Sequence, residues 1–414
     1  MNSTTPHWWH DGKFGLFIHW GLYSLLAGEY GGTVTDNIAE WILHDLDIPV
    51  EEYRKLASRF DPTRFNADAI VKMAHDAGMT YVVFTTKHHE GFAMYHSKVS
   101  SYNCVEASPF GRDPLAELRT ACDKYGLQLC LYYSQAQDWD DPDACREGDD
   151  GREKDFTSYF TRKCIPQVTE LLTNYGEIGL IWFDTPMYMT DAQSKQLKDV
   201  VKRLQPNCLI NGRIGNGLGD YMTTGDNFIP ALPFGAPFEV PATMNSTWGF
   251  STHDVNWKSS ERMICSLVKV VSRGGNYLLN IGPDGDGAVP SESVAILNDF
   301  SRFMGMNSQS IRETKPVPVY PYDVEGLFFT CEPGKLYIHV LESREQVYLL
   351  NIANKPTGCH LVADGKPLTL KERTTCEGDS SWLIALPPRN AGEIDQVVCV
   401  ELEEEAIVFE PIRW

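Results

Sequence analysis

Short apolar runs alternate with helical patterns from the start of the chain to about residue 310. The apolar runs cover residues 14–19, 80–86, 127–133, 178–183, 208–211 and 277–281. Helical periodicity marks residues 67–77, 113–125, 155–175 (interrupted by Pro166), 192–204, 260–273 and 291–304. Continuous apolar strands separated by helices indicate a parallel sheet that is buried on both faces. Six or seven such units in about 300 residues favour an α/β fold of the (β/α)8-like TIM-barrel type over an open doubly wound sheet.

The pattern changes beyond about residue 311. Short strand-like runs lie at 317–320, 327–331, 336–341, 347–352, 360–362, 382–386 and 397–402, with turn residues such as Pro333-Gly334 and Asp364-Gly365 between them. About 100 residues of short strands is the size of one antiparallel β-sandwich. We therefore expect a barrel catalytic domain in residues 1–312 and a small C-terminal β-sandwich in residues 313–414.

The charge balance restricts the partners. The chain has 56 acidic and 36 basic residues, a formal net charge of −20. Such a field repels phosphate backbones and anionic lipid, so we expect neither nucleic acid nor a membrane as a partner. Eleven cysteines without a CxxC pair indicate a reducing compartment. The expectation is a cytoplasmic, bacterial protein; secretion with a removed leader and the oligomeric state stay open.

Polar residues follow nearly every predicted strand of the barrel. Catalytic groups of barrel enzymes lie at the carboxyl ends of the strands. A single histidine or aspartate there is usually structural, but five such strand ends together indicate an active site. The five segments are His19-Trp20-Gly21, Lys87-His88-His89-Glu90, Tyr132-Tyr133-Ser134, Trp182-Phe183-Asp184 and Asn211-Gly212-Arg213.

The histidines suggest either a metal site or a pocket for neutral hydroxyl groups. Neither HxH after the first strand nor HExxH is present. Neighbours such as His88 and His89 point to opposite faces of an extended segment, which makes shared binding of one ion awkward. We therefore expect no metal and no cofactor. Aromatic faces beside hydroxyl-binding groups are typical of a sugar pocket; the candidates are Trp20, Trp41, Trp139, Trp182 and Trp248.

Cleavage of a glycoside needs two carboxyl groups. Asp184 follows an apolar strand, which fixes it rigidly at the mouth as a nucleophile requires. The second carboxyl group comes from Asp226 or Glu239. Both lie in residues 216–245, a stretch rich in Gly and Pro that we expect to be irregular and to form one wall of the pocket.

Seven motifs in this order resemble those of the α-L-fucosidases of glycoside hydrolase family 29, over about residues 7–306. The motifs are His19-Trp20-Gly21, Glu40-Trp41, Lys87-His88-His89-Glu90-Gly91-Phe92, Trp182-Phe183-Asp184, Asn211-Gly212-Arg213, Thr243-Met244-Asn245-Ser246-Thr247-Trp248-Gly249-Phe250 and Leu278-Leu279-Asn280-Ile281-Gly282-Pro283. The resemblance implies a retaining exo-glycosidase that releases terminal α-linked L-fucose from oligosaccharides or glycoconjugates by double displacement.

The resemblance also implies roles for individual residues. Asp184 matches the nucleophile, and Asp226, 42 positions later, matches the acid/base of one group of members. Glu239 matches the glutamate of the common W-E motif and is the alternative acid/base. The positions that match the fucose-binding residues are His19, Glu40, Trp41, His88, His89, Tyr133, Trp182 and Arg213, and Trp248 is the further aromatic candidate.

The sequence departs from the family pattern at two places. Thr185 replaces the usual glycine after the nucleophile, and Phe238 replaces the tryptophan before Glu239. These changes leave the linkage preference, the natural aglycone and transfucosylation open, and we expect them to depend on loops around Trp139, Phe234 and Trp248. The acidic residues 138–150 form a loop at the mouth that either screens aglycones or is mobile. The functional alternatives are a non-catalytic fucose-binding protein and a metal-dependent barrel hydrolase.

Overall fold

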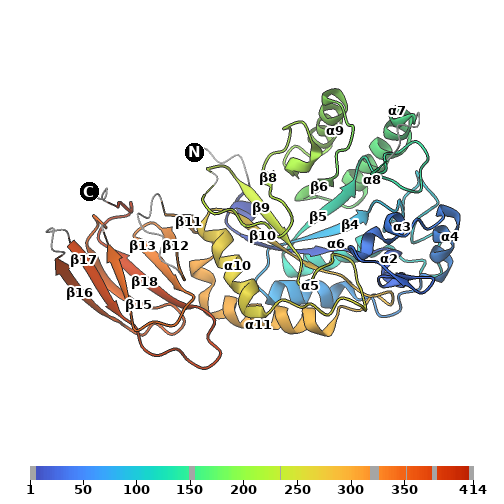
Figure 1. Cartoon of the computed structure of the whole chain (residues 1–414). Coiled ribbons are helices and arrows are strands. Elements are labelled where there is room, and N and C mark those ends of the chain that lie inside the picture. The colour runs from blue at the N-terminus through green and yellow to red at the C-terminus, as the bar shows by residue number, and fades with distance from the viewer. Residues whose placement is uncertain are drawn as a thin grey trace.

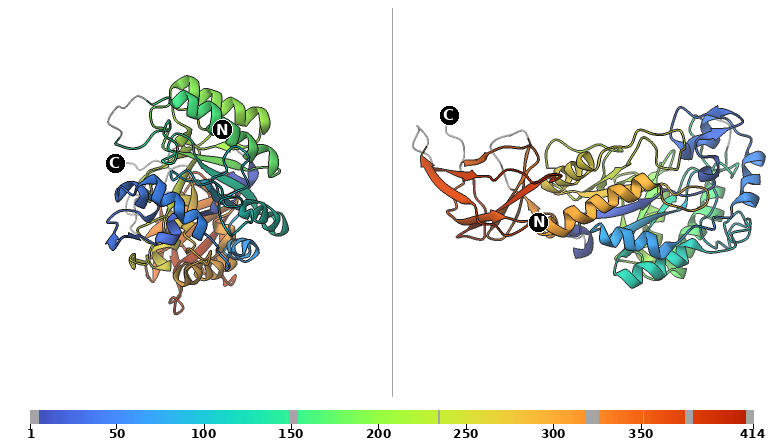
Figure 2. Two further views of the ribbon diagram at one scale, coloured as in Figure 1. Left: turned by 90° about the vertical axis from the view of Figure 1, so that its right-hand side faces the viewer. Right: turned by 90° about the horizontal axis from the view of Figure 1, so that it is seen from below.

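The chain folds into a barrel followed by a pair of antiparallel sheets, which lie end to end (Figure 1 and Figure 2, right). The structure, a computed structural model, describes residues 6–148, 154–233, 235–317, 326–350, 352–374 and 380–409. The helices α10 (Ser260–Ser272) and α11 (Ser291–Asn307) lie where the two parts meet in Figure 1. In the described part of the chain, no helix combines the length and apolar character that crossing a bilayer requires.

Eight parallel strands form the barrel, in sequence order around it. One β-bridge between Asn211 and Tyr221, which flank the short strands β7 and β8, links the two ends of the sheet. The prediction of a TIM-like barrel is therefore confirmed. The strands are β1 (Phe14–Ile18), β4 (Tyr81–Lys87), β5 (Gln128–Ser134), β6 (Leu180–Asp184), β7 (Leu209–Ile210), β8 (Met222–Thr223), β9 (Phe238–Ala242) and β10 (Asn276–Ile281).

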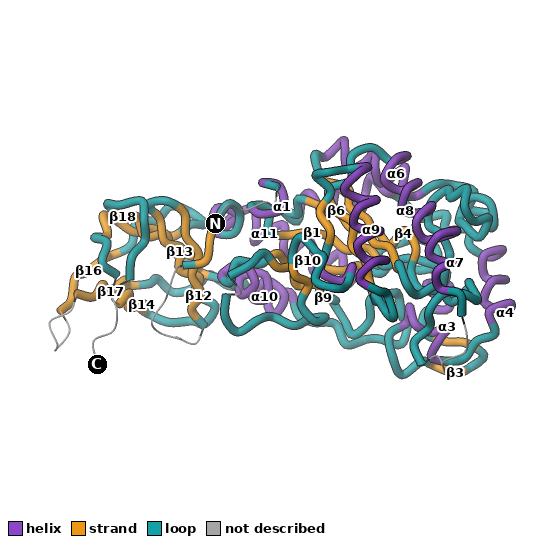
Figure 3. The backbone as a smooth tube through the Cα atoms, turned by 90° about the horizontal axis from the view of Figure 1, so that it is seen from above, coloured by secondary structure: helices purple, strands orange, loops and turns teal. Residues whose placement is uncertain are grey.

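Amphipathic helices cover the outside of the strands, as the tube in Figure 3 shows for α8 and α9 beside β6. Their ends follow ordinary capping chemistry. In α6 the carboxylate of Asp113 accepts from the backbone N–H of Ala116, and Gly126 ends the helix with φ of 72°. The long helices are α5 (Ala67–Asp76), α6 (Pro114–Tyr125), α8 (Ile165–Asn174), α9 (Asp191–Leu204), α10 and α11.

Several short helices and strands lie between the elements of the barrel. The helix expected at 155–175 is split into α7 (Phe156–Tyr159), a wide turn η3 (Phe160–Cys164) and α8, because Pro166 cannot donate a backbone hydrogen bond. The remaining short elements are α1 (His7–His10), α2 (Tyr23–Leu26), β2 (Glu29–Tyr30), β3 (Thr33–Val34), η1 (Ala39–Trp41), α3 (Ile42–Asp45), α4 (Val50–Arg54), η2 (Lys55–Arg59), η4 (Gly212–Ile214) and η5 (Ser308–Ser310).

Residues 216–245 are less irregular than expected, because they contain β8 and β9. Their sequence signal is weak for two reasons. The first of these strands has two residues, and the second contains Pro241, which pairs with Leu278 of β10. A proline normally argues against a central strand because it cannot donate to the ladder. Glu239 is therefore a strand residue and not a loop residue.

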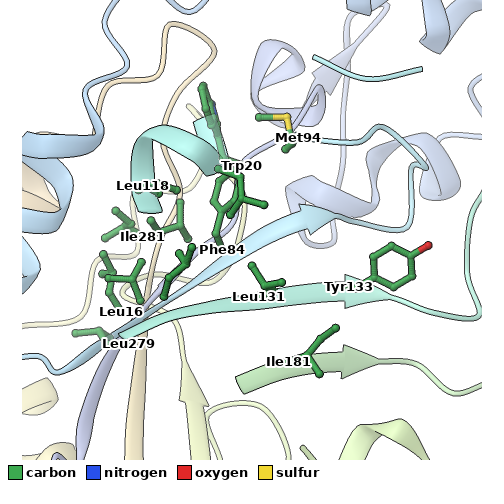
Figure 4. Close-up of a cluster of buried hydrophobic side chains, with 14 of the residues drawn as sticks. Leu16, Trp20, Phe84, Met94, Leu118, Leu131, Tyr133, Ile181, Leu279 and Ile281 are labelled. Carbon is green, nitrogen blue, oxygen red and sulfur yellow. The ribbon is translucent and has the colours of Figure 1, made fainter. Parts of the chain in front are cut away.

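Side chains alternate between the barrel interior and the layer under the helices. The interior cluster includes Phe17, Tyr81, Cys130, Tyr132, Trp182 and Leu278. The outer cluster includes Leu16, Phe84, Leu131, Tyr133, Ile181 and Leu279, which Figure 4 draws together. Successive residues of a strand point to opposite faces, so neighbours such as Tyr132 and Tyr133 enter different layers.

The C-terminal part has two antiparallel sheets with an apolar core between them, as predicted. The strand β16 was not expected, since Thr369–Thr374 is mostly polar, and the run expected at 317–320 lies outside the described residues beyond position 317. The boundary between residues 312 and 313 stays a prediction. One sheet contains β11 (Lys315–Pro316), β12 (Leu327–Glu332), β13 (Lys335–Val340), β18 (Gln396–Leu402) and β15 (Pro356–Leu361); the other contains β14 (Gln346–Leu350), β17 (Ser380–Ala385) and β16.

Candidate active site

A cavity of about 140 Å³ opens among residues at the carboxyl ends of the barrel strands. Most of the expected site residues line it: His19, Glu40, Trp41, His88, His89, Trp182, Asp184, Arg213, Asp226 and Trp248. Two expected residues, Tyr133 and Glu239, do not. Four residues that sequence reasoning did not assign to the site complete the lining: Phe17, Ile38, Tyr132 and Thr185.

Asp184 ends β6, and both of its carboxylate oxygens accept hydrogen bonds. Nη1 of Arg213 donates to Oδ1 over 3.0 Å, and the hydroxyl of Tyr132 donates to Oδ2 over 3.0 Å. Burial alone would raise the pKa of Asp184, but the charge of Arg213, the nearby His89 and these hydrogen bonds outweigh it and hold the pKa below its ordinary value. Asp184 is therefore an ionised, rigidly held carboxylate at neutral pH.

Arg213 joins the two candidate catalytic carboxylates. Its Nη1 donates to Asp184, its Nη2 donates to Oδ1 of Asp226, and its guanidinium lies 4.7 Å from the ring centre of Trp182. The side chain of Asp226 is 43% exposed, against 12% for Asp184. One carboxylate is thus held inside the cavity and the other lies at its solvent side.

Glu239 lies inside the barrel, away from the cavity lining, and this corrects its expected place at the pocket wall. It belongs to the first half of β9, where it pairs with Asn276 at the start of β10, and it is fully buried. Its carboxylate accepts from the hydroxyl of Tyr81 over 2.6 Å, from Nε1 of Trp182 over 2.9 Å and from the hydroxyl of Tyr221 over 3.2 Å. Burial raises the pKa of Glu239, although these hydrogen bonds oppose the rise.

Tyr133 also lies away from the cavity. Its neighbour Tyr132 lines the cavity instead. The Tyr133 hydroxyl donates to Oε1 of Gln167 over 2.8 Å. The Tyr133 ring belongs to the outer cluster that Figure 4 draws. The register explains the exchange. Tyr132 pairs with Trp182, and Ser134 pairs with Asp184, so these residues share the inner face of the barrel.

Three buried histidines line the inner side of the cavity. His88 and His89 follow the end of β4 and both face the cavity, with ring centres 4.1 Å apart, so the expectation that they point to opposite faces is wrong. Burial lowers the pKa of His19 to about 3 and that of His89 to about 4, and it places the pKa of His88 well below its ordinary value. All three imidazoles are therefore neutral near pH 7.

Hydrogen bonds behind the rings fix which nitrogen faces the cavity. Nδ1 of His19 lies 2.7 Å from Oδ1 of Asn280, an oxygen that can only accept. Nδ1 of His89 lies 2.7 Å from the hydroxyl of Ser134, whose own proton goes to the carbonyl of Gln137 over 2.8 Å. Both Nδ1 atoms therefore carry the proton, and each Nε2 is left as an acceptor for a ligand hydroxyl.

Glu40 and the aromatic residues complete the inner side. One carboxylate oxygen of Glu40 accepts from the backbone N–H of Gly249 over 2.8 Å and from the hydroxyl of Thr247 over 3.1 Å, and the side chain lines the cavity. Burial raises the pKa of Glu40 to about 7. The rings of Trp41 and Trp248 lie beside His89 and His19 at centroid distances of 5.2 and 5.0 Å. Apolar ring faces beside hydroxyl-binding groups suit a monosaccharide.

The acidic loop after β5 is anchored at its start. Asp138 is fully buried and pairs with Nζ of Lys87 at 3.0 Å and Nζ of Lys163 at 2.8 Å. Trp139 packs behind Trp41 and does not line the cavity. Residues 149 and 150 of this loop, and Phe234, lie outside the described residues. Among the residues that are described, no three His, Cys, Asp or Glu side chains converge as a metal site would require.

The chain is similar to known proteins over most of its length. The sequence model of the family described as Alpha-L-fucosidase matches residues 1–309. A tissue alpha-L-fucosidase of Bos taurus is 30% identical over 411 residues, which are 92% of this chain and 85% of that protein. The crystal structure of an alpha-L-fucosidase from Vibrio sp. strain EJY3 superposes with a TM-score of 0.93 at 33% identity, over 98% of this chain and 74% of that one.

A second solved structure matches a smaller share of the chain at higher identity. Alpha-L-fucosidase AlfC from Lactobacillus casei, in complex with its alpha-L-fucose product, is 44% identical with a TM-score of 0.69. The match covers 73% of this chain and 98% of that one. Because the family model spans most of the chain and includes all the cavity residues, this chain belongs to the α-L-fucosidase family of glycoside hydrolases.

Proposed function

We propose that the chain releases terminal α-linked L-fucose from oligosaccharides or glycoconjugates with retention, using Asp184 as the nucleophile and Asp226 as the acid/base. The observation that carries this proposal is the single guanidinium of Arg213, which binds both carboxylates at one cavity. Carboxyl groups that share one guanidinium are close together, and retaining glycosidases need a separation of about 5–5.5 Å. The buried position of Glu239 supports Asp226 over Glu239.

In the first step an oxygen of Asp184 attacks the anomeric carbon while the bond to the leaving oxygen breaks. Asp226 gives its proton to that oxygen, and a fucosyl ester of Asp184 forms. In the second step Asp226 removes a proton from water, the water oxygen bonds to the anomeric carbon, and the ester bond breaks. Two inversions give net retention, and both carboxyl groups return to their starting states.

The inner side of the cavity supports fucose as the sugar. Neutral imidazoles of His19 and His89 offer acceptors, and Glu40 offers a carboxylate oxygen, so the hydroxyl groups of a neutral sugar find partners there. The rings of Trp41, Trp182 and Trp248 offer apolar surface for the methyl group. Structures of AlfC with alpha-L-fucose and, as a variant, with Fuca(1,6)GlcNAc support fucosylated glycans as the substrate class.

A mechanism-based inhibitor tests the proposal. A fluorinated fucosyl fluoride should form a stable ester, and peptide mapping should place the label on the segment that contains Asp184. Incubation of the Asp184→Ala variant provides the control, which should stay unlabelled. A label on another segment, or an anomerically inverted product with the wild-type protein, would contradict the proposal.

A further inference from the structure

Glu239 is a buried carboxylate that the proposed reaction does not use. It lies below the cavity in the barrel interior, and its two oxygens accept from three aromatic side chains, those of Tyr81, Trp182 and Tyr221. Placing a carboxylate in the apolar interior costs free energy, which the three donors offset. Of these donors, the indole of Trp182 lines the cavity.

The indole of Trp182 supports both groups that hold Asp184. On one side the ring of Tyr132 stacks on it at 5.7 Å with an interplanar angle of 20°. The guanidinium of Arg213 also lies on it, 4.7 Å from the ring centre. Tyr132 then donates to Oδ2 of Asp184 and Arg213 to Oδ1, each over 3.0 Å. The two sets of contacts that fix the nucleophile therefore meet at one indole.

We propose that Glu239 is a positioning residue that fixes the indole of Trp182 and, through it, the two side chains that orient Asp184. The proposal rests on Asp184 as the proposed nucleophile. Nε1 is the single polar atom of an indole and can only donate, so its bond to Glu239 sets the rotation of the ring in its plane. Stacking alone leaves that rotation free, because ring faces present no directional partner.

The buried position of Glu239 distinguishes a positioning role from acid/base catalysis. Glu239 is fully buried beneath Trp182, whereas a proton donor must reach the leaving oxygen at the solvent side, where Asp226 lies. A positioning residue affects every leaving group equally, because it acts through the nucleophile. An acid/base affects poor leaving groups more than activated ones.

Three variants test the positioning role. Glu239→Gln keeps an oxygen for Trp182 but loses the charge of the acceptor, and Glu239→Leu removes the acceptor. Tyr81→Phe is the matched control, because it removes a donor to Oε1 and leaves the bond of Trp182 to Oε2 intact. The measurements are kcat and KM for fucosides with good and poor leaving groups, the pH profile of kcat/KM, the melting temperature and the indole N–H resonance of Trp182, assigned with Trp182→Phe.

For Glu239→Gln we expect a loss in kcat on the order of 10-fold, and for Glu239→Leu about 100-fold, the same for all leaving groups. The acid limb of kcat/KM should move to higher pH, because Arg213 and Tyr132 hold the pKa of Asp184 down. The Trp182 indole resonance should move in the glutamate variants. Tyr81→Phe should lower the melting temperature while it keeps the kinetics, the acid limb and the resonance of the wild type.

Wild-type kinetics in Glu239→Gln, or an unmoved acid limb and resonance, would overturn the positioning role. If Glu239→Leu does not fold, Glu239→Gln and Tyr81→Phe still decide the question. A loss confined to poor leaving groups and restored by azide in Glu239→Gln would make Glu239 the acid/base, which overturns this inference and the role of Asp226 together. A label away from Asp184 in the trapping experiment would overturn the proposed nucleophile separately.

Discussion

The inner and outer sides of the cavity are built from different chemistry. The inner side, made by His19, Glu40, His88 and His89, is 1–4% exposed and its imidazoles are neutral. The outer side is made by Thr185, Arg213 and Asp226. The guanidinium of Arg213 binds the carboxyl group of Asp226 there, and both side chains are partly open to solvent. Asp184 lies where the two sides meet.

The difference follows from what each side does in the proposed reaction. Hydroxyl groups of a sugar need partners of fixed direction but no charge, and neutral groups can be buried at lower cost than ions. Breaking a glycosidic bond needs charge and proton transfer, which an outer side in contact with water allows. In the proposed reaction, the inner side therefore binds the sugar, and the outer side carries out the chemistry and contacts the leaving group.

Replacing Asp184, where the inner and outer sides meet, should reduce activity more than any other change. Asp184→Ala removes the proposed nucleophile and should lower turnover of an aryl α-L-fucoside by about 10⁴-fold or more. Azide should then restore a fucosyl azide of inverted configuration. The inner side is unchanged, so binding of fucose, measured by calorimetry, should persist. A variant that keeps a tenth of the wild-type rate would show that Asp184 is not the nucleophile.

Asp226→Ala should have a smaller effect that depends on the leaving group. Loss of the proposed proton donor should lower kcat/KM by about 10²–10³-fold for poor leaving groups and by much less for activated aryl fucosides. Here azide should give a product of retained configuration. Glu239→Ala is the comparison variant: if it shows this dependence on the leaving group and Asp226→Ala does not, the two roles are exchanged.

The sequence predicts the inner side better than the outer side. Motifs at the ends of β1 and β4 predict His19, His88 and His89, because strand ends must meet at one mouth. It cannot distinguish Tyr132 from Tyr133, since two adjacent tyrosines satisfy either inward register. The pairing of Ser134 with Asp184 decides between them, and this pairing is a feature of the tertiary structure.

The outer side is harder to predict because its backbone is unusual. Residues 216–245 contain a strand of two residues and a strand with an internal proline, and neither has a clear sequence pattern. The sequence therefore predicts a loop at Glu239, whereas β9 carries this residue into the barrel interior. Thr185 is noticeable in sequence as a departure from glycine, but its left-handed conformation is known from the structure alone.

The charge of the outer side should set the acid limit of activity. Arg213 holds the pKa of Asp184 below its ordinary value against the effect of burial, and the reaction needs the ionised form. Activity is therefore lost as the pH falls through this pKa. Arg213→Gln removes the charge and leaves the burial, so the acid limb of kcat/KM should move to higher pH.

Kinetics across pH with one aryl fucoside measure this change. Arg302→Gln is the control, because Arg302 lies on α11 with a side chain that is 72% exposed. Its profile should match the wild type. An unmoved acid limb in Arg213→Gln would mean that the acid limit belongs to another group, and that the two sides of the cavity are not electrostatically distinct.

The smallest expected effect is a change in the free energy of unfolding, caused by the left-handed backbone conformation of Thr185. This β-branched residue has φ of 46°, and in the described part of the chain its buried hydroxyl oxygen meets no hydrogen-bond partner. A left-handed conformation costs about 1–2 kcal/mol, so Thr185→Gly should raise the free energy of unfolding by about 1 kcal/mol.

Tyr188→Gly is the matched control, since Tyr188 has φ of 57° and is 72% exposed. Both variants should be more stable in urea denaturation, but only Thr185→Gly, which widens the cavity, should change the ratio of kcat/KM between a disaccharide and an aryl fucoside. If that ratio stays constant while stability rises, the strain at Thr185 has no part in leaving-group selection, and the outer side is defined by its charges alone.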